Sequence, residues 1–216
     1  MGWKVSAVII NKAGRIADKQ LIEELGFVGL AKINDEMFQA AMYPRGNKVF
    51  IGVYKDNIIV CNCDLAMQFF EGHENYIERK LSRSFPGSEI CSIILQSTVD
   101  LWGYFIISKD QKLRARAGSS DDGTFMDIGD PVDEEIDLLN KATIDGSGNR
   151  TYTFDDLPDD IFEESQVGEN FVFAICKRYF GSALDENDEL LDTYLAGYTY
   201  RSFTSERPSK PWWKFW

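Results

Sequence analysis

The chain has few of the residues from which most catalytic and metal centres are built. It contains a single histidine, His73, and it lacks the G-x-S-x-G, P-loop and dinucleotide-binding patterns. Zinc sites need several thiolate or imidazole ligands. The sequence therefore argues against a zinc enzyme or a nucleotide-dependent enzyme, and it predicts a protein with no cofactor and no identifiable catalytic residue.

Cysteines are also few, and their arrangement favours structural roles. Cys61 and Cys63 form C-x-C in place of the redox motif C-x-x-C, and Cys91 and Cys176 lie in apolar runs. Buried free thiols in a reducing compartment account for this pattern, with metal binding or disulfide formation as the alternatives. No secretory signal is recognisable either, so we expect a cytoplasmic protein.

Positive charge is scarce, because 23 Lys and Arg residues stand against 35 Asp and Glu residues, for a net charge of −12. A nucleic-acid-binding surface needs a concentration of basic side chains. The one basic stretch without acids is at the C-terminus, with Arg207, Lys210 and Lys214. This balance excludes nucleic acid as a partner and disfavours binding to anionic membranes, and no apolar run approaches the roughly 20 residues of a membrane span.

Strand-forming segments dominate the rest of the chain. Residues 89–129 contain four apolar or alternating runs separated by tight turns, which predicts consecutive antiparallel strands. Helical patterns interrupt the strands without strict βαβ alternation, at residues 17–26, 65–72, 74–85, 130–142, 157–166 and 168–181. The expected fold is α+β, with a mainly antiparallel sheet of meanders and hairpins and with helices packed on one face.

One segment concentrates carboxylates that hold hard cations in other proteins. Asp121, Asp122 and Asp127 lie in the stretch AGSSDDGTFMDIGDPVDEE, close to Arg114 and Arg116. A metal-assisted hydrolase using this turn, residues 121–135, is one interpretation. The other is that Asp-Asp-Gly forms a tight turn and that the acids after Pro131 begin a helix, where the helix dipole favours them.

The longer segment WGYFIISKDQKLRARAGSSDDGTFMDIGDPVDEE resembles a family of uncharacterised bacterial proteins. The resemblance consists of an aromatic-glycine-aromatic strand, a strand carrying arginines, a Gly/Asp-rich turn, an IG-D-P step and paired acids. It covers about a sixth of the chain, and it implies no activity and no catalytic residues. The residues that carry it are Trp102, Gly103, Tyr104, Arg114, Arg116, Gly118, Asp122, Gly123, Gly129, Pro131, Glu134 and Glu135.

The C-terminal segment differs in composition from everything before it. We expect residues 1–205 to form one domain, with a weak subdivision near residue 87, and residues 206–216 to form a tail. Two prolines in the tail oppose helix and strand, and aromatic side chains beside lysines are typical of binding hot spots. The candidate partner-binding residues are Trp212, Trp213, Phe215 and Trp216.

These observations favour a non-enzymatic accessory protein whose tail docks on its own domain or on a protein partner. Packing of the tail on its own sheet, self-association and insertion into a membrane interface are the alternatives. The sequence leaves the partner and the oligomeric state open.

Overall fold

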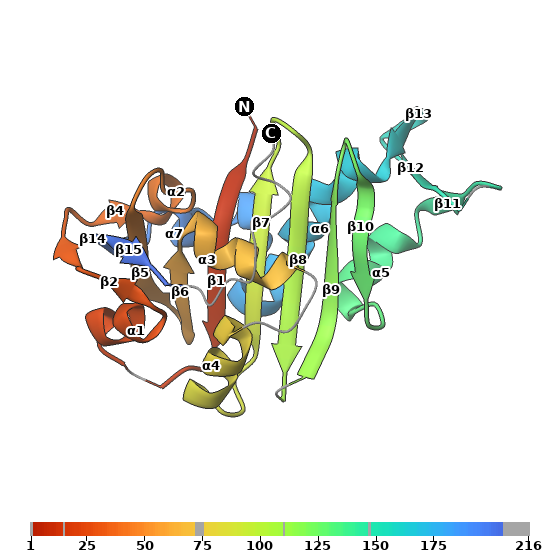
Figure 1. Ribbon diagram of the computed structural model, residues 1–216. Coiled ribbons are helices and arrows are strands. Elements are labelled where there is room, and N and C mark those ends of the chain that lie inside the picture. Colours follow the sequence, from red (N-terminus) through yellow and green to blue (C-terminus); the bar gives the residue numbers. More distant parts are fainter. Residues whose placement is uncertain (1, 15, 72–75, 110, 147, 205–216) are drawn as a thin grey trace.

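A computed structural model describes residues 2–14, 16–71, 76–109, 111–146 and 148–204. Its centre is a ten-stranded antiparallel sheet in the order β10-β9-β8-β7-β1-β6-β5-β14-β3, in which β4 also pairs with β14 (Figure 1). The strands are β1 (Lys4–Asn11), β3 (Ala31–Lys32), β4 (Glu36–Met37), β5 (Lys48–Tyr54), β6 (Asn57–Cys61), β7 (Ile90–Gln96), β8 (Leu101–Ser108), β9 (Gln111–Ser119), β10 (Gly123–Ile128) and β14 (Tyr194–Thr199).

The central strands are continuous apolar runs because both of their faces are covered. Along β1, Ala7 and Ile9 belong to one core, whereas Val8 and Ile10 belong to another. Side chains of a strand alternate between the two faces of its sheet. The chain therefore has two hydrophobic cores, one on each face.

The longest helix, α6 (Glu164–Phe180), covers one face together with α5 (Asp133–Leu139) and α7 (Asp188–Leu191). The other face carries α1 (Asp18–Glu24), α3 (Cys63–Met67) and α4 (Tyr76–Ser84), as Figure 1 shows. Short elements complete the fold: α2 (Phe38–Ala41), η1 (Gln68–Phe70), η2 (Leu184–Glu186), and the pair β2 (Phe27–Val28) and β15 (Ser202–Phe203).

The α+β class, the antiparallel sheet and the meander are confirmed, since β7, β8, β9 and β10 are consecutive neighbours. The helices lie on both faces, where the sequence led us to expect one. A strand covered on one face alternates apolar and polar residues, so the continuous apolar runs of the central strands were a signal for helices on both faces. Within the described residues, no helix is long and apolar enough to cross a membrane.

A second, three-stranded sheet projects from the β10 end of the molecule (Figure 1). It consists of β11 (Ala142–Ile144), β12 (Arg150–Phe154) and β13 (Leu157–Glu163), and we call it the arm. The predicted helix over residues 157–166 is wrong, because residues 157–163 form strand β13, which pairs with β12 at Leu157, Phe162 and Glu163, and the helix begins only at Glu164.

Candidate functional site

Two buried arginines organise the segment that carries the resemblance. Arg114 on β9 donates from Nε and Nη2 to the two carboxylate oxygens of Glu135 on α5, at 2.8 Å each. The Arg114 and Glu135 side chains are 2% and 0% exposed. Arg114 also donates from Nη1 to Asp127, at 2.5 Å, and to the carbonyl of Gly129, at 2.9 Å. Arg114 therefore links α5 and the end of β10 to β9.

Arg116 is fully buried two residues along β9, on the same face of the sheet. Its guanidinium carbon lies 4.5 Å from the ring centroid of Phe171 and 5.6 Å from that of Trp102. It forms an ion pair with Glu164 at the start of α6, and the Tyr152 hydroxyl donates to the same carboxylate at 2.9 Å. This contact joins the sheet, α6 and the arm.

The electrostatics of this network favour a structural role. Burial would lower the pKa of Arg114, but hydrogen bonds to Glu135 and Asp127 hold it above its usual value. Burial, with the nearby Glu135 charge, raises the pKa of Tyr104. Both groups therefore keep one protonation state near neutral pH, and neither is suited to proton transfer there.

The three aspartates proposed as metal ligands occupy different surroundings. Asp121 and Asp122 are exposed in the turn between β9 and β10. Asp127 lies farther along β10, five residues after Asp122, which is on the order of 15 Å in a strand. It forms ion pairs with Arg114, Arg116 and Arg150. In the part of the chain that is described, no group of three or more His, Cys, Asp or Glu side chains could hold a metal ion.

The tail residues Trp212, Trp213, Phe215 and Trp216 lie outside the described residues, as does His73. Among the surface depressions of the described residues, two have volumes of about 550 and 600 Å³.

The first depression, which we call the hollow, has a volume of about 550 Å³ at the end of the sheet where β7, β8 and β9 meet. Its wall is mainly apolar, and three aspartates lie among its residues: Asp64, Asp121 and Asp122. The apolar side chains are Met67, Ile94, Leu95, Val99 and Leu101. A volume between about 300 and 1,000 Å³ with apolar walls and a few polar groups is typical of ligand sites.

Cys63 also lines the hollow, and it is the one half-buried cysteine, because Cys61, Cys91 and Cys176 are buried. Burial raises the pKa of Cys63, and it raises the pKa of Cys176 to about 12. The expectation of free, mostly buried thiols is confirmed. Cys63 therefore provides a natural reporter of access to the hollow.

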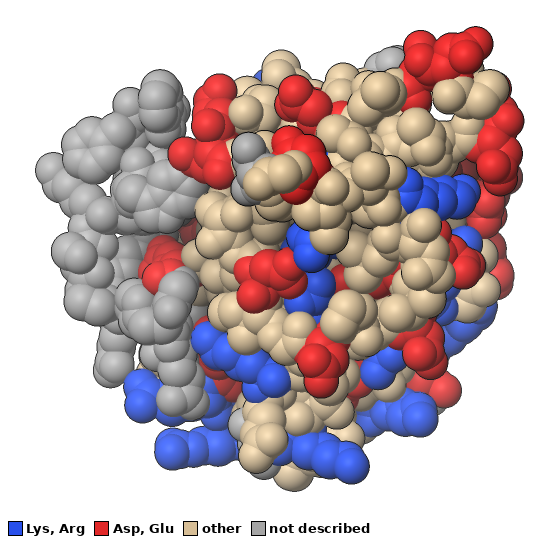
Figure 2. Space-filling view, turned by 90° about the vertical axis from the view of Figure 1, so that its right-hand side faces the viewer, with Lys and Arg blue, Asp and Glu red and all other residues tan. Residues whose placement is uncertain are grey.

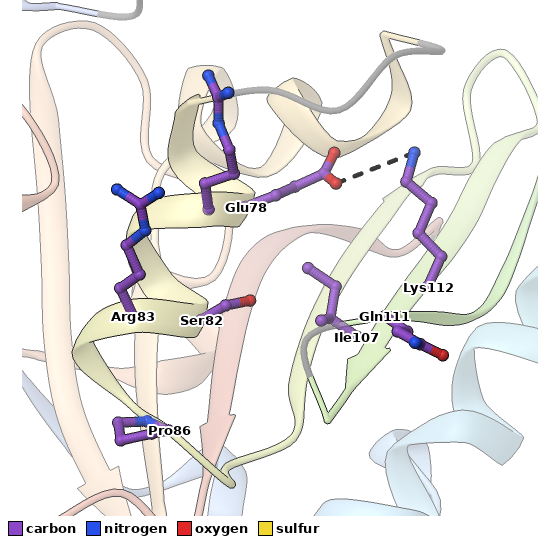
Figure 3. Close-up of a pocket in the computed structure, with 8 residues that line it drawn as sticks. Glu78, Ser82, Arg83, Pro86, Ile107, Gln111 and Lys112 are labelled. Carbon is purple, nitrogen blue, oxygen red and sulfur yellow. Dashed lines mark ion pairs between the residues drawn. The ribbon is translucent and has the colours of Figure 1, made fainter.

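The second depression, the basic groove, has a volume of about 600 Å³ between α4 and the β8–β9 hairpin. Glu78 on α4 and Lys112 on β9 point toward each other across it, and the Lys112 Nζ lies 3.9 Å from the Glu78 Oε2 (Figure 3). Arg79, Arg83 and Pro86 line the helix side, and Ile107 lines the hairpin side. Arg79 and Arg83 are exposed, and neither has an ion-pair partner among the described residues.

Both depressions are lined almost entirely by residues that match a family model. Residues 12–141 match the model of DUF6928, a family of unknown function. The chain belongs to this family. The matched residues contain the segment of the resemblance, every residue that lines the basic groove, and every residue that lines the hollow except Ser6. No curated protein and no solved structure matches the chain.

Sequence reasoning did not identify either depression, because each is lined by segments far apart in the chain. One signal for the basic groove was present, since Arg79 and Arg83 stand opposite the apolar stripe of Ile77, Leu81 and Phe85 in the predicted helix. A charged helix face is usually just solvated, so this pattern alone does not indicate a site.

Proposed function

We propose that this chain is a non-enzymatic protein-interaction module and that its tail, residues 206–216, is the ligand of the hollow. The proposal rests on the complementary chemistry of the hollow and the tail. The hollow is apolar with three aspartates, and the last ten residues carry four aromatic side chains, three bases and no acid.

The chemistry of the tail suits such a site. Tryptophan buries a large apolar area with few rotatable bonds, and it is enriched at the centres of protein interfaces. Lysine and arginine next to the aromatic side chains would face Asp121 and Asp122 at the edge of the hollow. Opposite charges at the edge of an interface accelerate association and set its orientation.

The course of the chain four residues before the described part ends at Thr204 supports docking on the same domain. The Tyr200 hydroxyl accepts a hydrogen bond from Asn62, which caps α3 directly before Cys63 and Asp64 of the hollow. The twelve residues after Thr204 can span up to about 40 Å when extended. The tail can therefore reach the hollow of its own domain. The same side chains would also allow it to bind the hollow of a second copy.

Maleimide modification of Cys63 tests the proposal, because a docked tail covers this thiol. A variant truncated after Ser205 is expected to react at Cys63 at least about tenfold faster than the full chain, as for a site protected by a bound ligand. A peptide of residues 206–216 added to the truncated chain should slow the reaction again. Equal rates for both proteins, with no effect of the peptide, would refute tail docking in the hollow.

The aspartates allow a matched control. The double variant Asp121→Asn/Asp122→Asn should weaken the protection of Cys63, because it removes charge beside the hollow. The double variant Asp155→Asn/Asp156→Asn removes the same charge from an exposed turn of the arm and should leave protection unchanged. Protection that is independent of protein concentration identifies the tail's own domain as its site, and protection that rises with concentration identifies a second copy.

A further inference from the structure

The basic groove presents three cationic side chains, Arg79, Arg83 and Lys112, on a protein whose net charge is −12. Arg79 and Arg83 are four residues apart, and residues with this spacing lie on the same face of a helix. Lys112 adds a positive charge across the groove, although Glu78 partly neutralises it. Guanidinium groups bind carboxylates through two parallel hydrogen bonds, which makes exposed arginines without ion-pair partners suitable for acidic side chains.

The groove also has an apolar part. Pro86 lines it just after the end of α4, and Ile107 lines it on the hairpin side (Figure 3). The charges are distributed along α4 and across to β9 and do not surround a single point (Figure 3). An extended segment that presents two or more carboxylates beside an apolar side chain fits this arrangement better than a single phosphate.

The arm presents such a segment. Residues 158–161 of β13 have no partner on β12, because the register shifts between the pairs Tyr152↔Phe162 and Phe154↔Leu157. This bulge carries Asp159, Asp160 and Ile161, and Ile161 is 71% exposed. Leu157 and Ile144, also on the arm, are 46% and 63% exposed. Exposed apolar side chains on a projecting edge strand mark a surface that binds another chain.

The arm and the groove cannot meet within one molecule. Figure 1 shows the arm projecting at the β10 end of the sheet, away from α4 and the lower end of the β8–β9 hairpin. Figure 2 shows Asp and Glu gathered toward the end where the arm projects and Lys and Arg gathered toward the opposite end. The complementary surfaces are thus at opposite ends.

We propose that the acidic bulge of the arm of one copy binds in the basic groove of a second copy. Asp159 and Asp160 face Arg79 and Arg83, and Ile161 contacts Pro86 and Ile107. At physiological salt the Debye length is about 8 Å, so these local attractions outweigh the repulsion between two acidic bodies. The contact is small, and a contact below about 1,200 Å² gives weak, concentration-dependent association.

Sedimentation equilibrium of four purified full-length proteins, the wild type and three double variants, tests this inference. The groove variant Arg79→Glu/Arg83→Glu and the arm variant Asp159→Lys/Asp160→Lys should each associate at least about tenfold more weakly than the wild type, because each puts like charges opposite one another. The control Lys19→Glu/Lys48→Glu makes the same charge change as the groove variant, on exposed lysines elsewhere, and should associate as the wild type does.

The decisive result is complementation between the two defective proteins. An equimolar mixture should form heterodimers, because the groove variant keeps a native arm and the arm variant keeps a native groove. Failure of the mixture to associate, or a wild type that is monomeric throughout the concentration range up to about 1 mM, overturns the inference. If the groove variant associates weakly while the arm variant associates like the wild type, another acidic segment occupies the groove. That result also overturns the inference.

This contact is independent of the tail. The variant truncated after Ser205 should keep the arm–groove association unchanged, so failure of one proposal leaves the other intact.

Discussion

At the scale of single residues, the acids of the segment resembling the family serve the fold. Glu135 and Asp127 both bind Arg114, and Glu164 binds Arg116. Transferring an ion from water into a protein interior costs several kcal/mol, so each buried arginine depends on its carboxylate partner. The acids of this segment therefore differ in role. Glu135, which was expected at the start of a helix, lies in the core, whereas Asp121 and Asp122, which were considered as metal ligands, lie on the surface.

The substitution Glu135→Gln should lower the free energy of unfolding by about 3 kcal/mol, because it leaves the Arg114 charge buried without its main partner. Urea denaturation at neutral pH measures this loss. The matched substitution Asp133→Asn, at an exposed position in the first turn of the same helix, should change the stability by less than about 0.5 kcal/mol. Equal effects of the two substitutions would contradict the structural role of the buried pair.

Glu89 gives a pH dependence with a defined sign. Burial acts to raise the pKa of its carboxyl, but hydrogen bonds from Arg178 and Tyr179 outweigh this and place the pKa below 4.5. A carboxyl whose pKa is lower in the folded state stabilises the fold above the unfolded-state pKa. That stability is lost as the pH falls through the folded-state pKa.

The wild type should therefore lose more stability than Glu89→Gln when the pH falls from about 6 to about 2. Unfolding titrations at several pH values provide the comparison. Parallel stability curves for the two proteins would show that the Arg178 contact does not lower this pKa.

At the scale of elements, the fit of α6 on the sheet depends on Gly168. A Cβ atom at this position would overlap the ring of Trp102, which is buried beneath the helix. Alanine gains about 1 kcal/mol over glycine in helix propensity, whereas overpacking a core costs about 1–3 kcal/mol and sometimes more. Because the overlap is with a rigid ring, we expect the packing cost to be larger.

Gly168→Ala should thus destabilise the protein by about 1–3 kcal/mol in thermal or urea unfolding. Asn170→Ala, at an exposed position of the same helix, should be neutral or slightly stabilising. A stabilised Gly168→Ala protein would show that helix propensity decides at this position and that the contact with Trp102 does not.

The elements that the sequence predicts well are those with a strong local signal. The hairpin of β5 and β6 and the meander have such a signal. The long helix was predicted from its length and its end, where Gly181 adopts the left-handed conformation of a helix C-cap, but its start lies four residues before the predicted one. Residues 157–163 were misassigned because Leu157 and Ile161 have helical spacing and acids follow Pro158. Pairing with β12 overrides that local pattern, and the helix begins later, where the Gln166 side chain accepts from the Glu163 amide.

At the scale of the whole molecule, the topology is beyond local prediction. β1 lies between β6 and β7, and β14 joins the sheet beside β5 although about 140 residues separate them in the chain. Such long-range pairings follow from the packing of the complete chain and leave no mark in any short window. The hollow and the basic groove are each lined by residues of several elements that come together only in the folded chain, which is why neither was predicted as a site.

The net charge of the chain also does not show how the charges are distributed over the surface, and this distribution matters for binding. The value of −12 excludes a strongly basic surface as a whole, yet Lys and Arg gather toward one end of the molecule (Figure 2). An acidic protein can therefore present a basic groove, an acidic arm and an aspartate-bearing hollow at separate places. Each of these surfaces selects a different chemistry, which is the property expected of an interaction module.

The most direct test of the central claim is calorimetric titration of the peptide of residues 206–216 into the chain truncated after Ser205. We predict saturable binding with one peptide per chain, weakened by added salt and by Asp121→Asn/Asp122→Asn. A titration without binding heat at several temperatures, with no change in peptide tryptophan fluorescence, would contradict the claim that the tail is the ligand of the hollow.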